Sequence, residues 1–497
     1  KNIEQTKAST KPVTIDLFDF VGQNDHPEFL NRDYTIRIDK SVLNKLLVTS
    51  PDLITLEIPI ASGKIKVDLY QHQLFASGFV FRTASGQSRQ AENMLFYHGG
   101  LQNNPASIAS LTIYEDGIAL QISDMYGDYN FHRMNTDEYV IYNDHDIIHQ
   151  NGFTCEAKGL NPFPDSEEVA EHHSRSSAVG DCIDVYVELD FEMYQRLGSS
   201  VDEAELFIAV LFNEVAAMYT AEAINIAVSE TLIWDTVDPY AVSDDVIQKL
   251  FAFGQNIMND YNGRLGHLLA GWLIPPGQSA TAGVAWTDVI CSDFFVTGNG
   301  EPGGPYGVSA NLQTTTAPFP NYSNNLAVVV HELGHNIGSP HTHACVWNGN
   351  NTQIDDCASV ASGSGPSCYN AASPILPGAG GGTVMSYCDL LGSVGIDLAN
   401  GFGPQPGDLI RQRYNLAPCV TGVNCSDIFG CTDPEAHNYN PNANMDDGSC
   451  ETCDDGIQNG DETDVDCGGV LCEPCCDLVI NELIITNTTC NEANGEV

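Results

Sequence analysis

The stretch that decides the fold is Val328-Val-Val-His-Glu-Leu-Gly-His-Asn-Ile-Gly-Ser-Pro-His341. His331 and His335 are four residues apart, so on a helix both imidazoles leave the same face and can bind one Zn²⁺. Glu332 follows the first histidine and can act as general base toward a water molecule that the metal activates. The pattern predicts a helix that carries two zinc ligands and a base.

The second half of this stretch supplies a third ligand. Gly338 can adopt the left-handed conformation that ends a helix, which lets the chain turn back and present His341 to the metal. A His-Glu-x-x-His pattern alone arises by chance in roughly a few per cent of such sequences, but adding the glycine and third histidine lowers this to roughly one in ten thousand. The long motif therefore predicts a three-histidine zinc site with an open coordination position.

A second motif follows at Gly381-Gly-Thr-Val-Met-Ser-Tyr-Cys388. The two motifs together resemble those of the metzincin zinc endopeptidases, whose methionine turn lies beneath the metal. The resemblance implies that Met385 is this methionine. Tyr387 repeats the Met-x-Tyr pattern of the astacin and serralysin branches, where the tyrosine binds zinc or steadies the oxyanion. Simple packing of the Tyr387 ring remains the alternative.

Around the zinc motif, the chain resembles the reprolysin, or ADAM-like, branch over roughly residues 181–420. Val187-Glu-Leu-Asp-Phe-Glu-Met-Tyr-Gln-Arg-Leu-Gly198 is similar to the segment that precedes the first catalytic helix there. Thr342 stands where reprolysins usually have Asp, so the subfamily and its substrate preference stay open. The resemblance also implies disulfides within Cys345–Cys388 and a pair between Cys291 and Cys419.

Composition limits the compartment and the partners. The chain has 66 Asp and Glu against 19 Lys and Arg, a formal net charge of −47, which argues against nucleic-acid and anionic-membrane partners. Its 17 cysteines begin only at Cys155, and nine lie between Cys425 and Cys490, which favours disulfides and an oxidising compartment. We expect a secreted protein without a transmembrane segment, with surface attachment through a further C-terminal region as an alternative.

Hydrophobic periodicity changes along the chain. Strand-like alternation dominates residues 10–145, as in 54–60 and 64–70. A βα alternation follows, with strands expected at 183–189 and 224–234 and helices at 202–219 and 244–260. We therefore expect a multi-domain chain. A β-rich propeptide at 1–176, with a cleavable linker near 164–180, precedes a metzincin catalytic domain at 181–422. This domain is expected to be α/β (α+β), with a mixed twisted sheet and an active-site helix. Small disulfide-stapled modules are expected at 423–452 and 453–476, and the start of a truncated further domain at 477–497.

The first domain suggests a latent enzyme. Phe96-Tyr-His-Gly-Gly100 and the strands after it resemble reprolysin propeptides. Cys155 precedes the polar linker, and its thiolate could occupy the open zinc position as an inhibitory switch. A structural disulfide between Cys155 and Cys182 is the competing interpretation. An activating protease is expected to cut near Arg175.

The tail modules resemble short repeats of secreted and surface-attached bacterial proteins. Units this small need disulfides in place of a core. Asp and Asn oxygens at Asn442-Ala-Asn-Met-Asp-Asp-Gly448 could bind Ca²⁺, although turn formation explains the same residues.

These features predict a zinc endopeptidase acting on proteins or peptides, with Glu332 as general base. By analogy, the substrate would lie antiparallel to an edge strand, for which Tyr306–Leu312 is the expected segment. A non-catalytic adhesion protein built on the same scaffold is the main alternative, and its usual sign is loss of a ligand or of the base. A zinc hydrolase acting on other bonds is a third interpretation.

Overall fold

The computed structural model describes residues 12–60, 63–91, 93–147, 182–241, 245–273, 281–314, 322–378 and 380–420, with short pieces beyond residue 420. Cys155, Arg175 and the linker expected near 164–180 lie outside the described residues. The chain divides into two compact units, residues 1–425 and residues 426–497. The division into propeptide, catalytic domain and modules therefore stays a prediction.

The N-terminal part of the first unit is a ten-stranded sheet in the order β1-β4-β5-β8-β9-β10-β11-β12-β3-β2. All neighbouring strands pair antiparallel except β1 and β4. The strand pattern predicted for residues 10–145 is confirmed. The strands are β1 (Val13–Ile15), β2 (Phe18–Gln23), β3 (Tyr34–Ile38), β4 (Leu53–Ile60), β5 (Gly63–His72), β8 (Leu95–Leu101), β9 (Ile108–Tyr114), β10 (Gly117–Asp124), β11 (Gly127–Arg133) and β12 (Glu138–Asn143), with helix α2 (Lys40–Thr49) before β4.

A second sheet has seven strands in the order β16-β19-β15-β13-β14-β6-β7. Its inner strands run parallel, and the edge strand β16 is antiparallel to β19. Every residue of β13 is buried, as expected for a strand covered on both faces. The strands are β6 (Phe81–Thr83), β7 (Ser88–Arg89), β13 (Ile183–Leu189), β14 (Ile226–Ile233), β15 (Leu265–Leu269), β16 (Gly283–Ala285) and β19 (Tyr306–Ser309).

This strand order corrects one expectation. Tyr306–Leu312 was expected to form the sheet edge, but β19 pairs with β15 on one side and with β16 on the other. The edge beside it is β16. The residues of β16 and β19 are all buried, so strand pairing and not burial distinguishes the edge strand from the interior strand.

In the described part of this region, six helices follow or separate these strands: α3 (Phe191–Arg196), α4 (Val201–Ala221), α5 (Val246–Ile257), α6 (Tyr322–Ile337), α7 (Cys357–Ser362) and α8 (Pro404–Leu416). The side chain of Ser200 caps α4 by accepting from the amide of Glu203.

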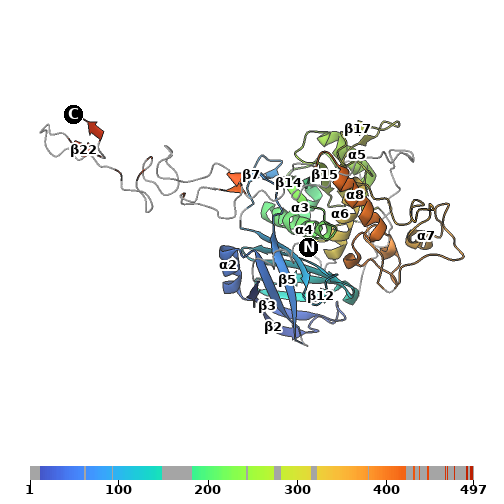
Figure 1. The fold of residues 1–497 in the computed structure, drawn as a ribbon, viewed down its shortest axis with the longest axis horizontal. Helices are drawn as coiled ribbons and strands as arrows, with labels where there is room; N and C mark the ends of the chain where they lie inside the picture. The colour runs from blue at the N-terminus through green and yellow to red at the C-terminus, as the bar shows by residue number, and fades with distance from the viewer. Residues whose placement is uncertain are drawn as a thin grey trace. The chain divides into compact units, whose positions relative to one another are not determined.

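By length and apolar composition alone, α4 could cross a membrane. In the fold it is mostly buried and contacts β9, β14 and α6, so it serves as a core helix. Figure 1 shows α4 and α6 with the blue N-terminal sheet on one side.

A long segment with little regular structure connects α6 to α8. Two disulfides close loops within it, Cys345–Cys368 and Cys357–Cys388, and Cys291–Cys419 joins the segment after β16 to the end of α8. The pair Cys291–Cys419 and the bonding within Cys345–Cys388 are thus confirmed.

The second unit is described only in short pieces. They include the strand pairs β20 (Phe429–Gly430) with β21 (Met445–Asp446) and β22 (Thr488–Cys490) with β23 (Ala493–Gly495). Cys467 and Cys475 form a disulfide. The segment expected to bind Ca²⁺ lies largely outside the described residues, so calcium binding there stays a prediction.

Candidate active site

Helix α6 positions the zinc motif. Its residues from Val328 to Ile337 are all buried, so this part of the helix packs against other elements on all its faces. Gly338 has a φ of +134°, and the amides of Gly338 and Ser339 both donate to the carbonyl of Gly334, at 3.1 and 2.9 Å. The helix therefore ends where the glycine was expected to end it, and the chain turns back toward the helix face.

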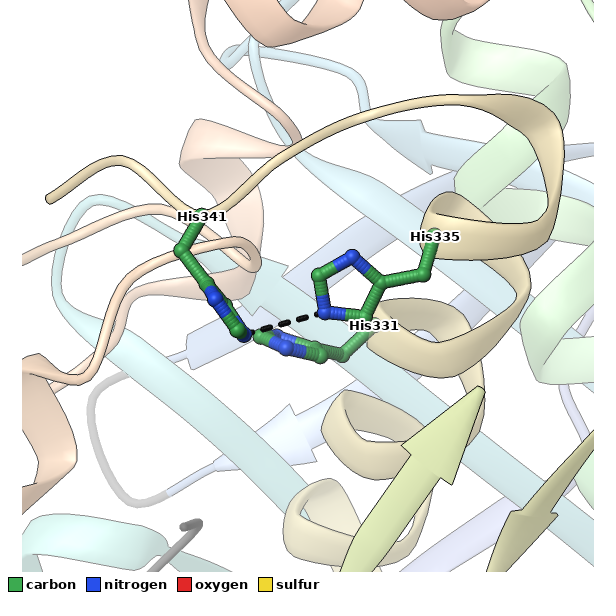
Figure 2. Close-up of side chains that lie close together, drawn as sticks. All are labelled: His331, His335 and His341. Carbon is green, nitrogen blue, oxygen red and sulfur yellow. Dashed lines mark hydrogen bonds between the residues drawn. The ribbon is translucent and has the colours of Figure 1, made fainter. Parts of the chain in front are cut away.

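Three imidazoles meet at one point. His331 and His335 come from α6, and His341 comes from the segment that follows (Figure 2). The side-chain nitrogens available as ligands lie within 4.8 Å of one another, and the Nε2 atoms of His335 and His341 are 3.0 Å apart. All three residues are buried, with 4 to 7% of their surface exposed. The structure thus brings together the three residues predicted as zinc ligands.

Backbone carbonyls orient two of these rings. The Nδ1–H of His331 donates to the carbonyl of Val384 at 2.8 Å, and that of His335 donates to Ser339 at 2.7 Å. These bonds leave Nε2 as the ligand atom, and Nε2 of His331 is buried without a hydrogen-bond partner.

Burial also sets the protonation of the site. It lowers the pKa of His331 to about 4 and the pKa values of His335 and His341 well below their usual range. The rings are therefore neutral at pH 7. Neutral, oriented imidazoles with one unused nitrogen suit Zn²⁺, so the residues present fit the metal that the motif implies.

Glu332 follows His331 on α6, and its side chain is fully buried. Neither carboxylate oxygen has a hydrogen-bond partner among the described residues, and burial raises the pKa of Glu332 well above its usual range. A carboxylate in such surroundings binds a proton more strongly than one in water, which suits a general base. Gly283 of the edge strand β16 lies directly against this carboxylate, because a Cβ at Gly283 would collide with Glu332. The edge of the second sheet therefore borders the proposed base.

The methionine turn packs beneath the helix. Met385 is completely buried, and a Cβ placed on Gly334 would come within 2.9 Å of its Sδ. The carbonyl of Met385 accepts from the amide of Thr342 at 3.1 Å, which ties the turn to the residue after the third histidine. The hydroxyl of Tyr387 is 3.0 Å from Nε2 of His341. Tyr387 thus borders the three histidines, and Met385 packs against the helix that carries two of them.

Several functional contacts were missed from the sequence. Nδ2 of Asn336 donates to the carbonyls of Trp286 and Tyr306, at 2.8 and 3.0 Å, and so fixes α6 to the ends of β16 and β19. The only available signal for Gly283 was a glycine inside a short apolar run, which often marks a close backbone approach.

A second cluster of side chains lies as close together as metal ligands do, but two of its members form a disulfide. Side-chain atoms of Asp355, Cys357 and Cys388 lie close together. Because the two sulfurs form a disulfide, they cannot act as thiolate ligands.

Comparison with known proteins agrees with this geometry. Residues 181–390 match the Reprolysin_5 model of metallopeptidase family M12, so this part of the chain is similar to metallopeptidases. Among solved structures, metalloproteinase-II from Bacteroides fragilis is similar at 10% identity, over 62% of this chain and 90% of that one, with a TM-score of 0.35. A chaperone-substrate complex is similar at 12% identity, over 48% of this chain and 28% of that one, with a TM-score of 0.22. Both structural likenesses are too weak to carry an argument.

Proposed function

We propose that this chain is a zinc-dependent endopeptidase. The observation that carries the proposal is the convergence of three buried, neutral imidazoles, two of them on the helix that also carries the buried Glu332 carboxylate, which has no hydrogen-bond partner among the described residues. The similarity of residues 181–390 to metallopeptidases supports the same conclusion. The finer assignment to a reprolysin-like branch rests on the motif alone.

His331, His335 and His341 would hold the metal. When bound, Zn²⁺ supplies Lewis-acid polarisation of a carbonyl and makes water acidic enough to react at neutral pH. Glu332 accepts the proton of the attacking water at its carboxylate and then donates that proton to the leaving amine. The hydroxyl of Tyr387 can donate a hydrogen bond to the negative charge that develops on the substrate carbonyl oxygen.

The edge strand supplies a place for a peptide. Among the described strands, β16 pairs only with β19, so its other side can accept an extended peptide by β-augmentation. Gly283 and Ala285 are small, and Gly283 lies against the Glu332 carboxylate. A peptide paired with β16 would therefore pass the Glu332 carboxylate.

Digestion of a peptide library tests the proposed activity. The chain, after cleavage in the linker, is expected to cut internal peptide bonds, to lose this activity in o-phenanthroline, and to regain it with added Zn²⁺. Cleavage that continues undiminished in the chelator would reject the metal, and absence of cleavage by zinc-loaded protein would favour the adhesion alternative. The presence of all three histidines and of Glu332 argues against that alternative.

We further propose that the enzyme is secreted and made in a latent form. Cys182 is disulfide-bonded. A bond between Cys182 and Cys155 would account for this and would compete with binding of Cys155 to zinc. Cys155→Ala separates the two mechanisms. A zinc-bound thiolate predicts that the uncleaved variant becomes active, because the open metal position is released. The disulfide predicts lower stability with latency unchanged. Activity of the uncleaved variant and its unfolding temperature, measured beside wild type, decide between them.

A further inference from the structure

Residues 74–91 of the N-terminal region, here called the strap, belong to the second sheet. The strap contains β6 and β7, and β6 pairs parallel with β14, with Phe81 opposite Thr231 and Thr83 opposite Ile233. Backbone hydrogen bonds extend the contact in both directions. Ala84 donates to Ile233, Ala76 donates to Val228, and Val228 donates to Leu74, each at 2.9 Å. The strap thus completes a sheet whose other strands lie more than 90 residues later in the chain.

The strap also shares a hydrophobic core with residues 182–420, here called the catalytic region. Leu74, Phe79 and Phe81 are 0, 7 and 1% exposed, and they belong to the same apolar cluster as Val228 of β14 and Phe212 of α4. The rings of Phe79 and Phe81 contact each other edge to face, with centroids 4.7 Å apart. Separating the two regions would expose these side chains to water, which is strongly unfavourable.

Polar contacts link the two regions beyond the strap. Asn213 of α4 is completely buried, and its Nδ2 donates to the carbonyl of Leu111 at 3.1 Å and to Oγ1 of Thr112 at 3.0 Å. Its Oδ1 lies 2.9 Å from Nε2 of His98. All three partners belong to the N-terminal sheet. Losing that sheet would leave a buried amide without its partners.

Two ion pairs also join the strap to the catalytic region. Arg82 pairs with Glu230 of β14 at 2.8 Å, and Arg89 pairs with Asp202 of α4 at 2.7 Å. The strap carries the positive charge and the catalytic region the negative charge, so the contact is electrostatically complementary.

The strap occupies the far edge of the sheet from the candidate active site. In the order β16-β19-β15-β13-β14-β6-β7, the strand beside Glu332 stands at one end and the strap at the other. Five strand spacings separate β16 from β6, about 24 Å at ordinary strand separation. A peptide can therefore reach β16 while the strap remains in place.

We propose that residues 12–147 stay bound to the catalytic region after the linker is cut, as a permanent non-covalent subunit. The proposal concerns association and does not depend on peptidase activity.

The test uses the full chain with a specific protease site introduced within residues 164–180. Cys155→Ala and Cys182→Ala are included, so that no disulfide between these residues can hold the fragments together. After cleavage, size-exclusion chromatography and native mass spectrometry in non-denaturing buffer are expected to find both fragments in one 1:1 complex, which separates only in denaturant. Independent elution of the two fragments in native buffer would overturn the proposal.

A matched pair of variants tests the role of the strap. Phe81→Ala removes a buried ring and is expected to speed dissociation of the cut complex at least about tenfold. Phe20→Ala removes a ring that is 42% exposed on β2 of the same N-terminal region, so dissociation should change less than about twofold. Equal rates for both variants would show that the strap does not hold the subunit. The cut chain without these changes decides the main proposal even if Phe81→Ala fails to fold.

Discussion

Glu332→Gln is expected to lower kcat/KM for peptide cleavage by about 10²- to 10⁴-fold, the usual contribution of a general base. Glutamine has nearly the same shape as glutamate but cannot accept the proton of the attacking water. The three histidines are unchanged, so zinc content and fold should be retained. Because the native carboxylate is buried without a hydrogen-bond partner, a neutral amide there should not destabilise the chain through loss of a contact.

The control for this variant is Glu192→Gln, which removes a carboxylate from the exposed surface of α3. The control should keep the activity of wild type within about twofold. Kinetics, zinc content and unfolding temperature are measured together for all three proteins. Near-wild-type turnover by Glu332→Gln would remove Glu332 from the mechanism.

His335→Ala is expected to abolish stable zinc binding and to lower activity at least about a hundredfold, since even changes outside the ligand shell cost 10- to 100-fold. His335 contributes a buried, oriented imidazole from the centre of the site, where its Nε2 lies 3.0 Å from that of His341. Alanine leaves two nitrogen ligands, which is below the three that catalytic zinc sites ordinarily use.

His343→Ala is the matched comparison. Its ring stacks on that of His341, with centroids 4.9 Å apart, but it does not belong to the group of three histidines that can share a metal ion. The variant should keep one zinc per chain. Zinc retained by His335→Ala but lost from His343→Ala would show that the ligand set is wrong.

Several strands and helices of the region around the second sheet could be predicted from periodicity. The expected strand at 183–189 and the helices near 202–219 and 244–260 correspond to β13, α4 and α5. These elements are long and have clear apolar patterns, so local sequence determines them. The active-site helix was predicted from its motif, because histidines four residues apart share one face of a helix.

The edges of this sheet could not be predicted. β16 has three residues, too few for a periodic signal, and its edge position depends on pairing with β19. At the other edge, β6 pairs with β14 across about 150 residues of chain, and no local pattern encodes such a contact.

The candidate site was predictable only in part. His331, Glu332, His335 and His341 follow from spacing, because the chemistry requires those side chains. The carbonyls of Val384 and Ser339, which orient two of the rings, have no signature because any residue carries a carbonyl. The contact between Gly283 and Glu332 joins segments that meet only in the folded chain.

Metal analysis of the purified chain tests the central claim most directly. Wild type and Glu332→Gln should each contain one zinc per chain, His335→Ala should contain almost none, and only wild type should cleave peptides after the linker is cut. Peptide cleavage by wild-type protein that contains no zinc, or zinc binding that survives loss of His335, would contradict the account.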